Sequence, residues 1–407
     1  MTAGPAAATG GQPDGDEEPL RVSTLELFFD LVFAFTLTQL TSVLASRLSW
    51  LAAAQVLLVF GLLWWMYGAY AWLTNSRPPR RTTERLLLLV GMAGFLVVGL
   101  AIPRGFASYG LVLGLGYLLV VLVHAVLYYR VNANIVRVAP FNIASALLII
   151  AAGLIHGPGG TESWPGYLLW LAALVVQLGS PLVVPVRNLF ELRPAHFTER
   201  HNALLIVAIG ESVAAVGIGA AGPAASGRGG PDWALLAAAV LGLAVGAALW
   251  WIVFGSGDEE RAERVLTAAD SKRRTGLALS AFFYGFIPLL LGLIALAAGI
   301  LRVVTLTAAH QGAGGDLSTA VRVWQAAVLA AGGALFLAGD VLIRRQLGTG
   351  AVRLRGLAAL AALATVVVGL AAGLEAQLAV VAVVLVAPLV AEREPAGDRV
   401  ARGDAAG

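Results

Sequence analysis

The sequence predicts an all-α protein, a polytopic transmembrane helical bundle of about 12 spans, and three observations lead to this fold class. Hydrophobic residues make up 59% of the 407 residues and charged residues only 13%, whereas soluble domains average about 45–50% and about 25%. Several apolar runs reach the ~18–20 residues that cross a bilayer core. The basic residues gather in alternate connections between these runs, as the positive-inside rule requires of a multi-pass protein.

Twelve apolar runs account for most of the chain. They cover residues 26–46, 51–73, 86–103, 107–129, 138–155, 164–186, 202–221, 233–254, 276–301, 323–343, 356–372 and 375–391. The last two runs are joined by a very tight turn and are expected to form a helical hairpin. Residues 21–391 are therefore interpreted as the membrane domain. Residues 1–20 and 392–407 are rich in small and charged residues, and we expect both to be disordered tails.

The distribution of Lys and Arg predicts the orientation of the chain. Of the 27 basic residues, 18 lie in even-numbered connections, five in odd-numbered connections and four in the tails. This count treats Arg200 as a connection residue and leaves no basic residue deep inside a span. We therefore expect both termini on the cytoplasmic side of a bacterial inner membrane.

A topology assay tests this orientation. Reporters fused after Arg402 and inserted near Lys272 are expected to read cytoplasmic, and a reporter near Arg228 is expected to read external. The alternation is wrong if positions 228 and 272 lie on the same side.

The first predicted span opens with two carboxylates. Ser23 and Glu26 have the S-x-x-E spacing of a capping box, which is a purely structural explanation of Glu26. Asp30 follows one turn later on the same helix face, about 6 Å deeper. A charge inside a membrane helix is costly and marks function by default, and this face is expected to turn toward the bundle interior. The alternative for Asp30 is an ion pair with a loop arginine.

The seventh span carries the second polar stretch. Glu199, Arg200 and His201 are placed at its cytoplasmic mouth, after His196. Glu211 lies about 15 Å further along the helix, near the bilayer midplane. Either Glu211 is functional, or its carboxyl group joins helices together with Ser212.

Two further expectations concern the seventh span. Gly210 should let a neighbouring helix approach closely. The spacing of His196, Glu199 and His201 does not place all three on one helix face, so we expect no metal site.

Residue types and motifs that are absent from the sequence exclude several classes of chemistry. The chain has no cysteine, which excludes disulfides, thiolate metal sites and cysteine nucleophiles. Nucleotide-binding, catalytic-triad and nucleic-acid motifs are also missing, so we expect no cofactor and no nucleic-acid partner. Asp340 is interpreted as a member of an interfacial ion pair, and the pair Trp64-Trp65 as part of an interfacial belt.

The polar stretches at the first and seventh spans suggest two parallel six-helix halves, residues 21–190 and 191–391, which is a known transporter plan.

The two stretches also carry a family resemblance. Leu25-Glu26-Leu27-Phe28-Phe29-Asp30 resembles the opening signature of the bacterial low temperature requirement A (LtrA) family. His196-Phe197-x-Glu199-Arg200-His201, followed by Gly210-Glu211-Ser212, resembles its second signature. The similarity extends from about residue 20 to 391. The family usually has an aromatic residue followed by Asp after its double Trp. In this sequence Phe254 is followed by Gly255 instead. The family name records cold growth and implies no activity.

Three functions are compatible with these features. The first is a secondary transporter or ion-conducting protein that uses intramembrane carboxylates, with Glu211 or Asp30 as the titrating group. The second is an intramembrane enzyme acting on a lipid or isoprenoid-like substrate, with His201 among its acid–base groups. The third is a non-catalytic membrane or regulatory component. The expected partners are the lipid bilayer and an unidentified small molecule or ion, and a homo-oligomer stays open.

Overall fold

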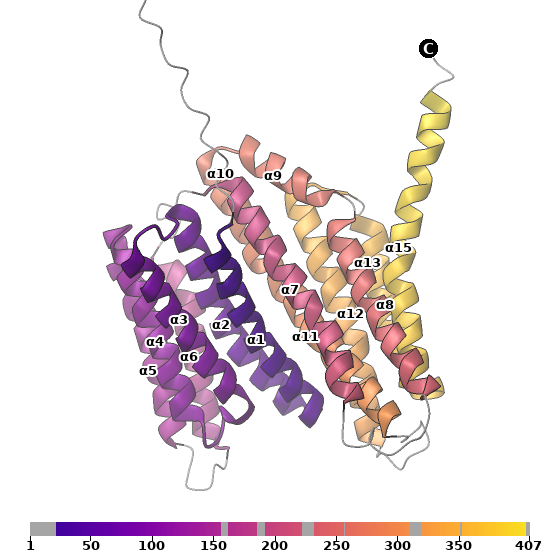
Figure 1. Cartoon of the computed structure of the whole chain (residues 1–407), viewed down its shortest axis with the longest axis horizontal. Helices are drawn as coiled ribbons and strands as arrows, with labels where there is room; N and C mark the ends of the chain where they lie inside the picture. Colours follow the sequence, from indigo (N-terminus) through magenta and orange to yellow (C-terminus); the bar gives the residue numbers. More distant parts are fainter. Residues whose placement is uncertain are drawn as a thin grey trace, which may run out of the picture.

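The computed structural model describes residues 22–155, 162–184, 192–221, 232–255, 257–309, 319–350 and 352–403. Helices connected by short turns make up these ranges, and they contain no β-strand. The expected tail of residues 1–20 lies outside the described residues. Consecutive spans run antiparallel, so their connections alternate between the two ends of the molecule (Figure 1).

Six helices form the first bundle, coloured indigo to magenta on one side of Figure 1. They are α1 (Thr24–Arg47), α2 (Trp50–Ser76), α3 (Thr82–Ala101), α4 (Gly110–Tyr129), α5 (Ala139–Ile155) and α6 (Trp164–Val183), with 3₁₀ turns η1 (Ile102–Arg104) and η2 (Ala133–Arg137). Serine side chains begin three of these helices. Ser23, Ser49 and Ser163 each accept a hydrogen bond from a backbone N–H of the first turn, which satisfies an otherwise unpaired donor.

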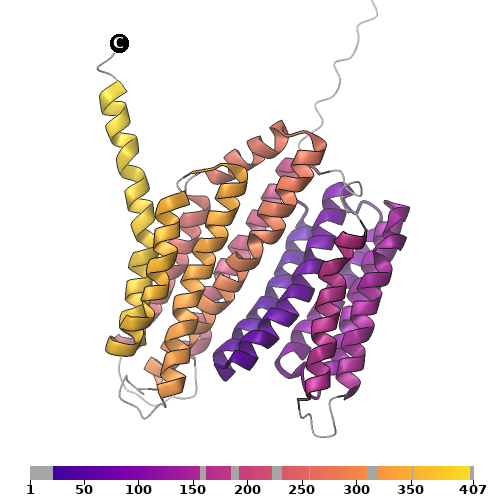
Figure 2. The same cartoon turned by 180° about the vertical axis from the view of Figure 1, so that it is seen from behind.

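The second bundle contains the remaining helices, and Figure 2 shows it from behind. They are α7 (Pro194–Ala220), α8 (Trp233–Phe254), α9 (Asp258–Ala268), α10 (Ser271–Leu277), the π-helix η5 (Ala278–Tyr284), α11 (Phe286–Ala308), α12 (Thr319–Leu347), α13 (Val352–Ala364), α14 (Val366–Ala372) and α15 (Leu374–Gly403). The tight turn between the last two spans is confirmed. Gly373 has φ 95° there, a conformation that favours glycine.

The two bundles share one packing order. In the first, α1 packs on α2 and α3, and contacts continue from α3 through α4 and α5 to α6, which returns to α2. In the second, α7 packs on α8 and α11, and contacts continue through α12 and α13 to α15, which returns to α8. The six spans of each bundle therefore follow the same order of helix contacts, and the division into two parallel halves stays a prediction.

A buried glutamine occupies the last span of each bundle. Gln177 on α6 accepts hydrogen bonds from Tyr117 on α4 (2.6 Å) and Ser145 on α5 (3.1 Å). Gln377 on α15 donates to the Ala326 carbonyl on α12 (2.8 Å) and to Thr365, between α13 and α14 (3.3 Å). Each glutamine thus joins the fourth, fifth and sixth spans of its bundle, because an amide in an apolar interior needs hydrogen-bond partners.

The predicted fold class is confirmed. Among the described residues, 11 helices are long and apolar enough to cross a membrane, and α5 is a further apolar helix of 17 residues. The protein is therefore a multi-pass helical membrane protein with about twelve spans.

Two predicted boundaries differ most from the structure. The seventh span starts at Pro194 rather than at residue 202, because its charged first turns find partners on neighbouring helices. The last helix continues to Gly403 through most of the expected C-terminal tail. Glu392 anchors it to Arg355, and extending an existing helix is far easier than nucleating one. The yellow end of α15 extends beyond the other helices in Figure 1.

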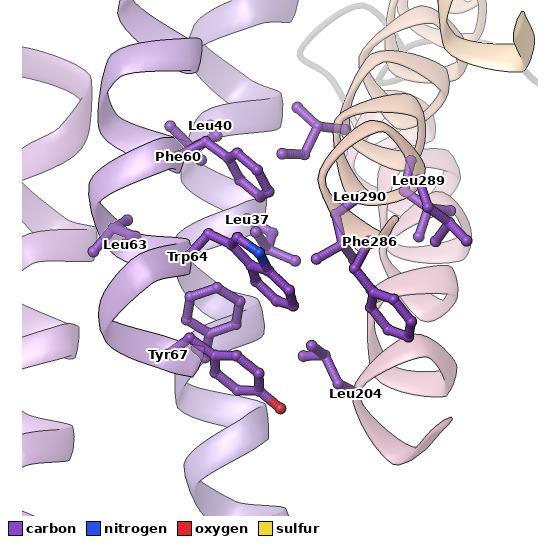
Figure 3. Close-up of a cluster of buried hydrophobic side chains, with 14 of the residues drawn as sticks. Leu37, Leu40, Phe60, Leu63, Trp64, Tyr67, Leu204, Phe286, Leu289 and Leu290 are labelled. Atoms are coloured by element: carbon purple, nitrogen blue, oxygen red, sulfur yellow. The ribbon is translucent and has the colours of Figure 1, made fainter. Parts of the chain in front are cut away.

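Aromatic and leucine side chains join the two bundles. Figure 3 shows Phe60, Trp64 and Tyr67 of α2 facing Leu204 of α7 and Phe286 of α11. The prediction that Trp64 belongs to an interfacial belt is wrong. Its side chain is 1% exposed, stacks on Phe286 at 6.0 Å and donates a hydrogen bond to the Phe283 carbonyl at 3.0 Å. Its indole N–H therefore has a partner within the protein instead of at the membrane surface.

Candidate functional site

A cluster of four charged or ionisable side chains lies between the first helices of the two bundles. Glu26 and Asp30 come from α1, and His196 and Arg200 come from α7. All four are buried, with exposed fractions of 0%, 0%, 2% and 1%. Both pairs have i, i+4 spacing, so each occupies one face of its helix. The two faces meet, and acidic residues of one bundle oppose basic residues of the other.

Arg200 is the centre of this cluster. Its Nη1 lies 3.2 Å from Oε1 of Glu26, and its Nη2 lies 3.3 Å from Oδ1 of Asp30. Nη1 also donates to the hydroxyl group of Thr74 on α2. The guanidinium carbon lies 5.5 Å from the ring centre of Phe29 and 5.8 Å from that of Tyr67. The arginine therefore holds α1, α2 and α7 together by charge and by cation–π contact.

His196 is oriented by an asparagine of α2. The side chain of Asn75 is fixed because its Oδ1 accepts from the Arg193 N–H and its Nδ2 donates to the Arg193 carbonyl, both at 3.0 Å. The same Nδ2 lies 3.2 Å from Nδ1 of His196. Since Nδ2 is a donor, Nδ1 must accept, and the ring proton sits on Nε2. Nε2 then donates to Oε2 of Glu26 at 3.2 Å.

The cluster is not fully satisfied. Tyr67 donates to Oδ1 of Asp30 at 3.0 Å. However, the second carboxylate oxygen of Asp30 and Nε of Arg200 are both buried without a hydrogen-bond partner in the described structure. With His196 as the Nε2–H tautomer, two carboxylates oppose one guanidinium. The site thus retains one unused acceptor, one unused donor and an excess of negative charge.

The structure brings together half of the residues predicted from the sequence. Glu26, Asp30, His196 and Arg200 meet, and the inward orientation of the Glu26–Asp30 face is confirmed. The capping box at Glu26 is also present, so this side chain serves both the helix start and the cluster. Asp30 does pair with an arginine, but Arg200 lies inside α7 and not in a loop or at the helix mouth.

The other residues of the second stretch point elsewhere. Glu199 is exposed and accepts a hydrogen bond from the Val22 N–H at 3.2 Å. His201 is buried against Phe197, and its Nδ1 donates to the Phe197 carbonyl at 2.8 Å. His196, Glu199 and His201 therefore turn in three directions and do not form a joint ligand set.

Glu211 forms a second polar contact along the same helix interface. The side chain is half-buried, and its Oε2 accepts a hydrogen bond from the Thr38 hydroxyl of α1 at 2.5 Å. Ser212 donates to the Ile209 carbonyl of its own helix at 2.7 Å and does not join Glu211. The expectation for Gly210 is wrong, because an added Cβ would meet nothing within 4 Å. Gly210 lies on an exposed strip of α7.

Sequence reasoning missed the contribution of α2. Tyr67, Thr74 and Asn75 all contact the cluster. Tyr67 and Thr74 are seven residues apart, two helical turns, and thus share a face. A polar stripe of this kind within an apolar span was the signal that could have identified them.

A second ion cluster lies at the α8–α9 end of the second bundle and confirms the ion pair expected for Asp340. Nη1 of Arg355 lies 2.9 Å from Oδ2 of Asp340, and Nε of Arg355 lies 2.9 Å from Oε1 of Glu392. Arg344 pairs with Asp340 at 3.2 Å and also with Asp258 at the start of α9. This cluster joins α9, α12, α13 and α15.

Comparison with known proteins agrees with the motifs. The family model described as "Bacterial low temperature requirement A protein (LtrA)" matches residues 21–390. The chain is also similar to "Uncharacterized protein RA0937" of Rhizobium meliloti (strain 1021), with 29% identity over 290 residues, covering 69% of this chain and 68% of that protein. The matched family region includes both polar stretches and the helices up to residue 390.

Proposed function

Because the chain belongs to the bacterial low temperature requirement A (LtrA) family, whose name specifies no activity, we propose its function from the site: a secondary transporter or ion-conducting protein in which the α1–α7 cluster couples the two bundles. The arginine-rich end of the molecule faces the cytoplasm in this proposal. The protein moves a proton or a small cation along the interface between the bundles.

The unsatisfied cluster is the observation that carries this proposal. Ion pairs that serve only stability gain most when every donor and acceptor is used, since unpaired buried groups are costly. Here Asp30 keeps a free oxygen next to Arg200 with 0% exposure. A proton or a cation can occupy this oxygen, and its arrival weakens the attraction between Asp30 and Arg200. Such a change acts directly on the contact between the two bundles.

The polar groups continue along the same interface. Thr38 lies eight residues after Asp30, about 12 Å at helical rise, and it contacts Glu211. Thr41 is buried on α1, and its hydroxyl has no hydrogen-bond partner in the described structure. Glu211 is therefore placed in the proposed path as a second carboxylate, beyond the cluster. Together these groups provide polar steps through an otherwise apolar contact between bundles.

Flux measurements in liposomes test the proposal. Wild-type protein is expected to carry protons, Na⁺ or K⁺ faster than empty liposomes, as reported by entrapped pH-sensitive and cation-sensitive dyes. Asp30→Asn and Glu211→Gln preserve shape while removing the negative charge and titration. Both variants are expected to insert normally and to lose flux.

Glu260→Gln on the exposed face of α9 is the matched control and should retain wild-type flux. Full flux of Asp30→Asn at every pH would remove the cluster from the mechanism. Absence of wild-type flux for all three ions, combined with altered lipid extracts from deletion cells, would favour the intramembrane enzyme instead.

A further inference from the structure

A second polar site lies on the other side of α7. A partly open cavity of about 60 Å³ is lined by residues of α7, α8, α9, η5, α11 and α12, and its polar lining includes Thr198, Asn202, Asp258, Asp340 and Arg344. Thr198 is two residues from both His196 and Arg200, about 200° around the helix. The charged cluster and this cavity thus use opposite faces of α7 and share no residue.

Two side chains of α7 enter the cavity without partners. Thr198 is 2% exposed, and its hydroxyl group has no hydrogen-bond partner in the described structure. The amide nitrogen of Asn202, one turn further along, is likewise buried and unpaired. Buried polar groups are costly unless they find a partner. The Asn202 amide requires an acceptor, and a ligand that carries an oxygen atom would provide it.

The charged side chains around the cavity indicate whether a bound ligand would be positive or negative. Asp258, Glu259 and Asp340 line it together with Arg344. Arg344 is already paired with Asp258 and Asp340. Outside the cavity lining, Arg355 pairs with both Asp340 and Glu392. Asp258 also pairs with Arg261 at 3.1 Å. Four carboxylates therefore stand against three guanidinium groups, and the one negative charge in excess favours a cation.

The wall formed by α9 is fixed in place. Ala262 and Leu266 of α9 are buried against the bundle. Arg274 binds the carbonyl groups at the end of this helix, with Nε to Leu266 at 2.9 Å and Nη2 to Thr267 and Ala269 at 3.1 and 3.0 Å. A basic side chain at a helix C-terminus is favourable because the carbonyls there are unpaired. The cavity therefore has a rigid side.

We propose that this cavity is a binding site for a small ammonium compound that carries a hydroxyl or carbonyl oxygen. The ammonium group lies at the carboxylates of Asp258 and Asp340, and the oxygen accepts a hydrogen bond from Asn202 while Thr198 pairs with the same end. A bare metal ion fits less well, because the described residues bring no three His, Asp or Glu side chains into a common ligand set. The site is independent of the proposed ion path.

Calorimetric titration of the detergent-solubilised full chain tests the site with ethanolamine as the probe. Ethanolamine is expected to bind. Ethylamine, which lacks the oxygen, is expected to bind about tenfold more weakly, because it loses one to two hydrogen bonds. Ethylene glycol lacks the charge and glycolate reverses it, so both should give no binding heat. All titrations use constant ionic strength.

Two variants locate the probe. Asn202→Leu and the nearly isosteric Thr198→Val should each weaken ethanolamine binding toward the ethylamine value and leave ethylamine unchanged. Thr305→Val on α11 removes a hydroxyl that donates to the Leu301 carbonyl outside the cavity and should bind ethanolamine normally. The proposal is overturned if ethanolamine gives no heat, if glycolate binds as well, or if both α7 variants bind ethanolamine like wild type.

Discussion

Replacing Arg200 by methionine is expected to lower the free energy of unfolding by about 3–5 kcal/mol, the usual cost of breaking a buried ion pair from one side. The variant leaves Glu26 and Asp30 buried without their shared cation. It also removes the donor to Thr74 and the cation–π contacts with Phe29 and Tyr67. Chemical denaturation of the purified protein in mixed micelles measures the loss.

A compensating variant separates charge from packing. Arg200→Met combined with Glu26→Gln and Asp30→Asn removes all three formal charges, and glutamine at position 26 retains the capping-box spacing. Replacing a buried ion pair by neutral groups of similar size is often close to neutral. The triple variant should therefore recover most of the lost stability. If it is as unstable as Arg200→Met alone, the arginine acts through packing and not through its charge.

The second large effect is expected where α11 and α12 touch through glycines. A Cβ added at Gly292 would lie 2.8 Å from the Gly332 carbonyl oxygen and from Cα of Phe336, and closer still to the Phe336 nitrogen. A side chain can relieve such a clash by changing its rotamer, but backbone atoms cannot. Gly292→Ala should therefore force the two helices apart and cost about 1–3 kcal/mol or more, measured by the same denaturation experiment.

Gly210→Ala is the matched control on α7. An added methyl group there meets nothing within 4 Å, and alanine is the better helix former by up to about 1 kcal/mol. Gly210→Ala should therefore be neutral or stabilising. Equal losses for the two variants would show that the α11–α12 contact is not as close as the structure describes.

The sequence by itself determined the fold class and the number of spans. Membrane length and apolar composition are local properties, since each residue contributes its own transfer free energy to lipid. The same reasoning predicted that Glu26 and Asp30 face the bundle interior, because a charge exposed to lipid is too costly. The short pattern around these residues also identified the family. None of this required knowledge of which helices are neighbours.

Only the tertiary structure decided how these residues are used. Whether Arg200 reaches α1 or remains at a helix mouth depends on where α7 begins and how it is rotated. Tyr67, Thr74 and Asn75 joined the site because α2 packs beside α1 and α7. Glu211 found Thr38 instead of the cluster, and Thr198 and Asn202 faced a separate cavity. Helix rotation, register and neighbours are set by packing summed over many contacts, and no single stretch of sequence contains that sum.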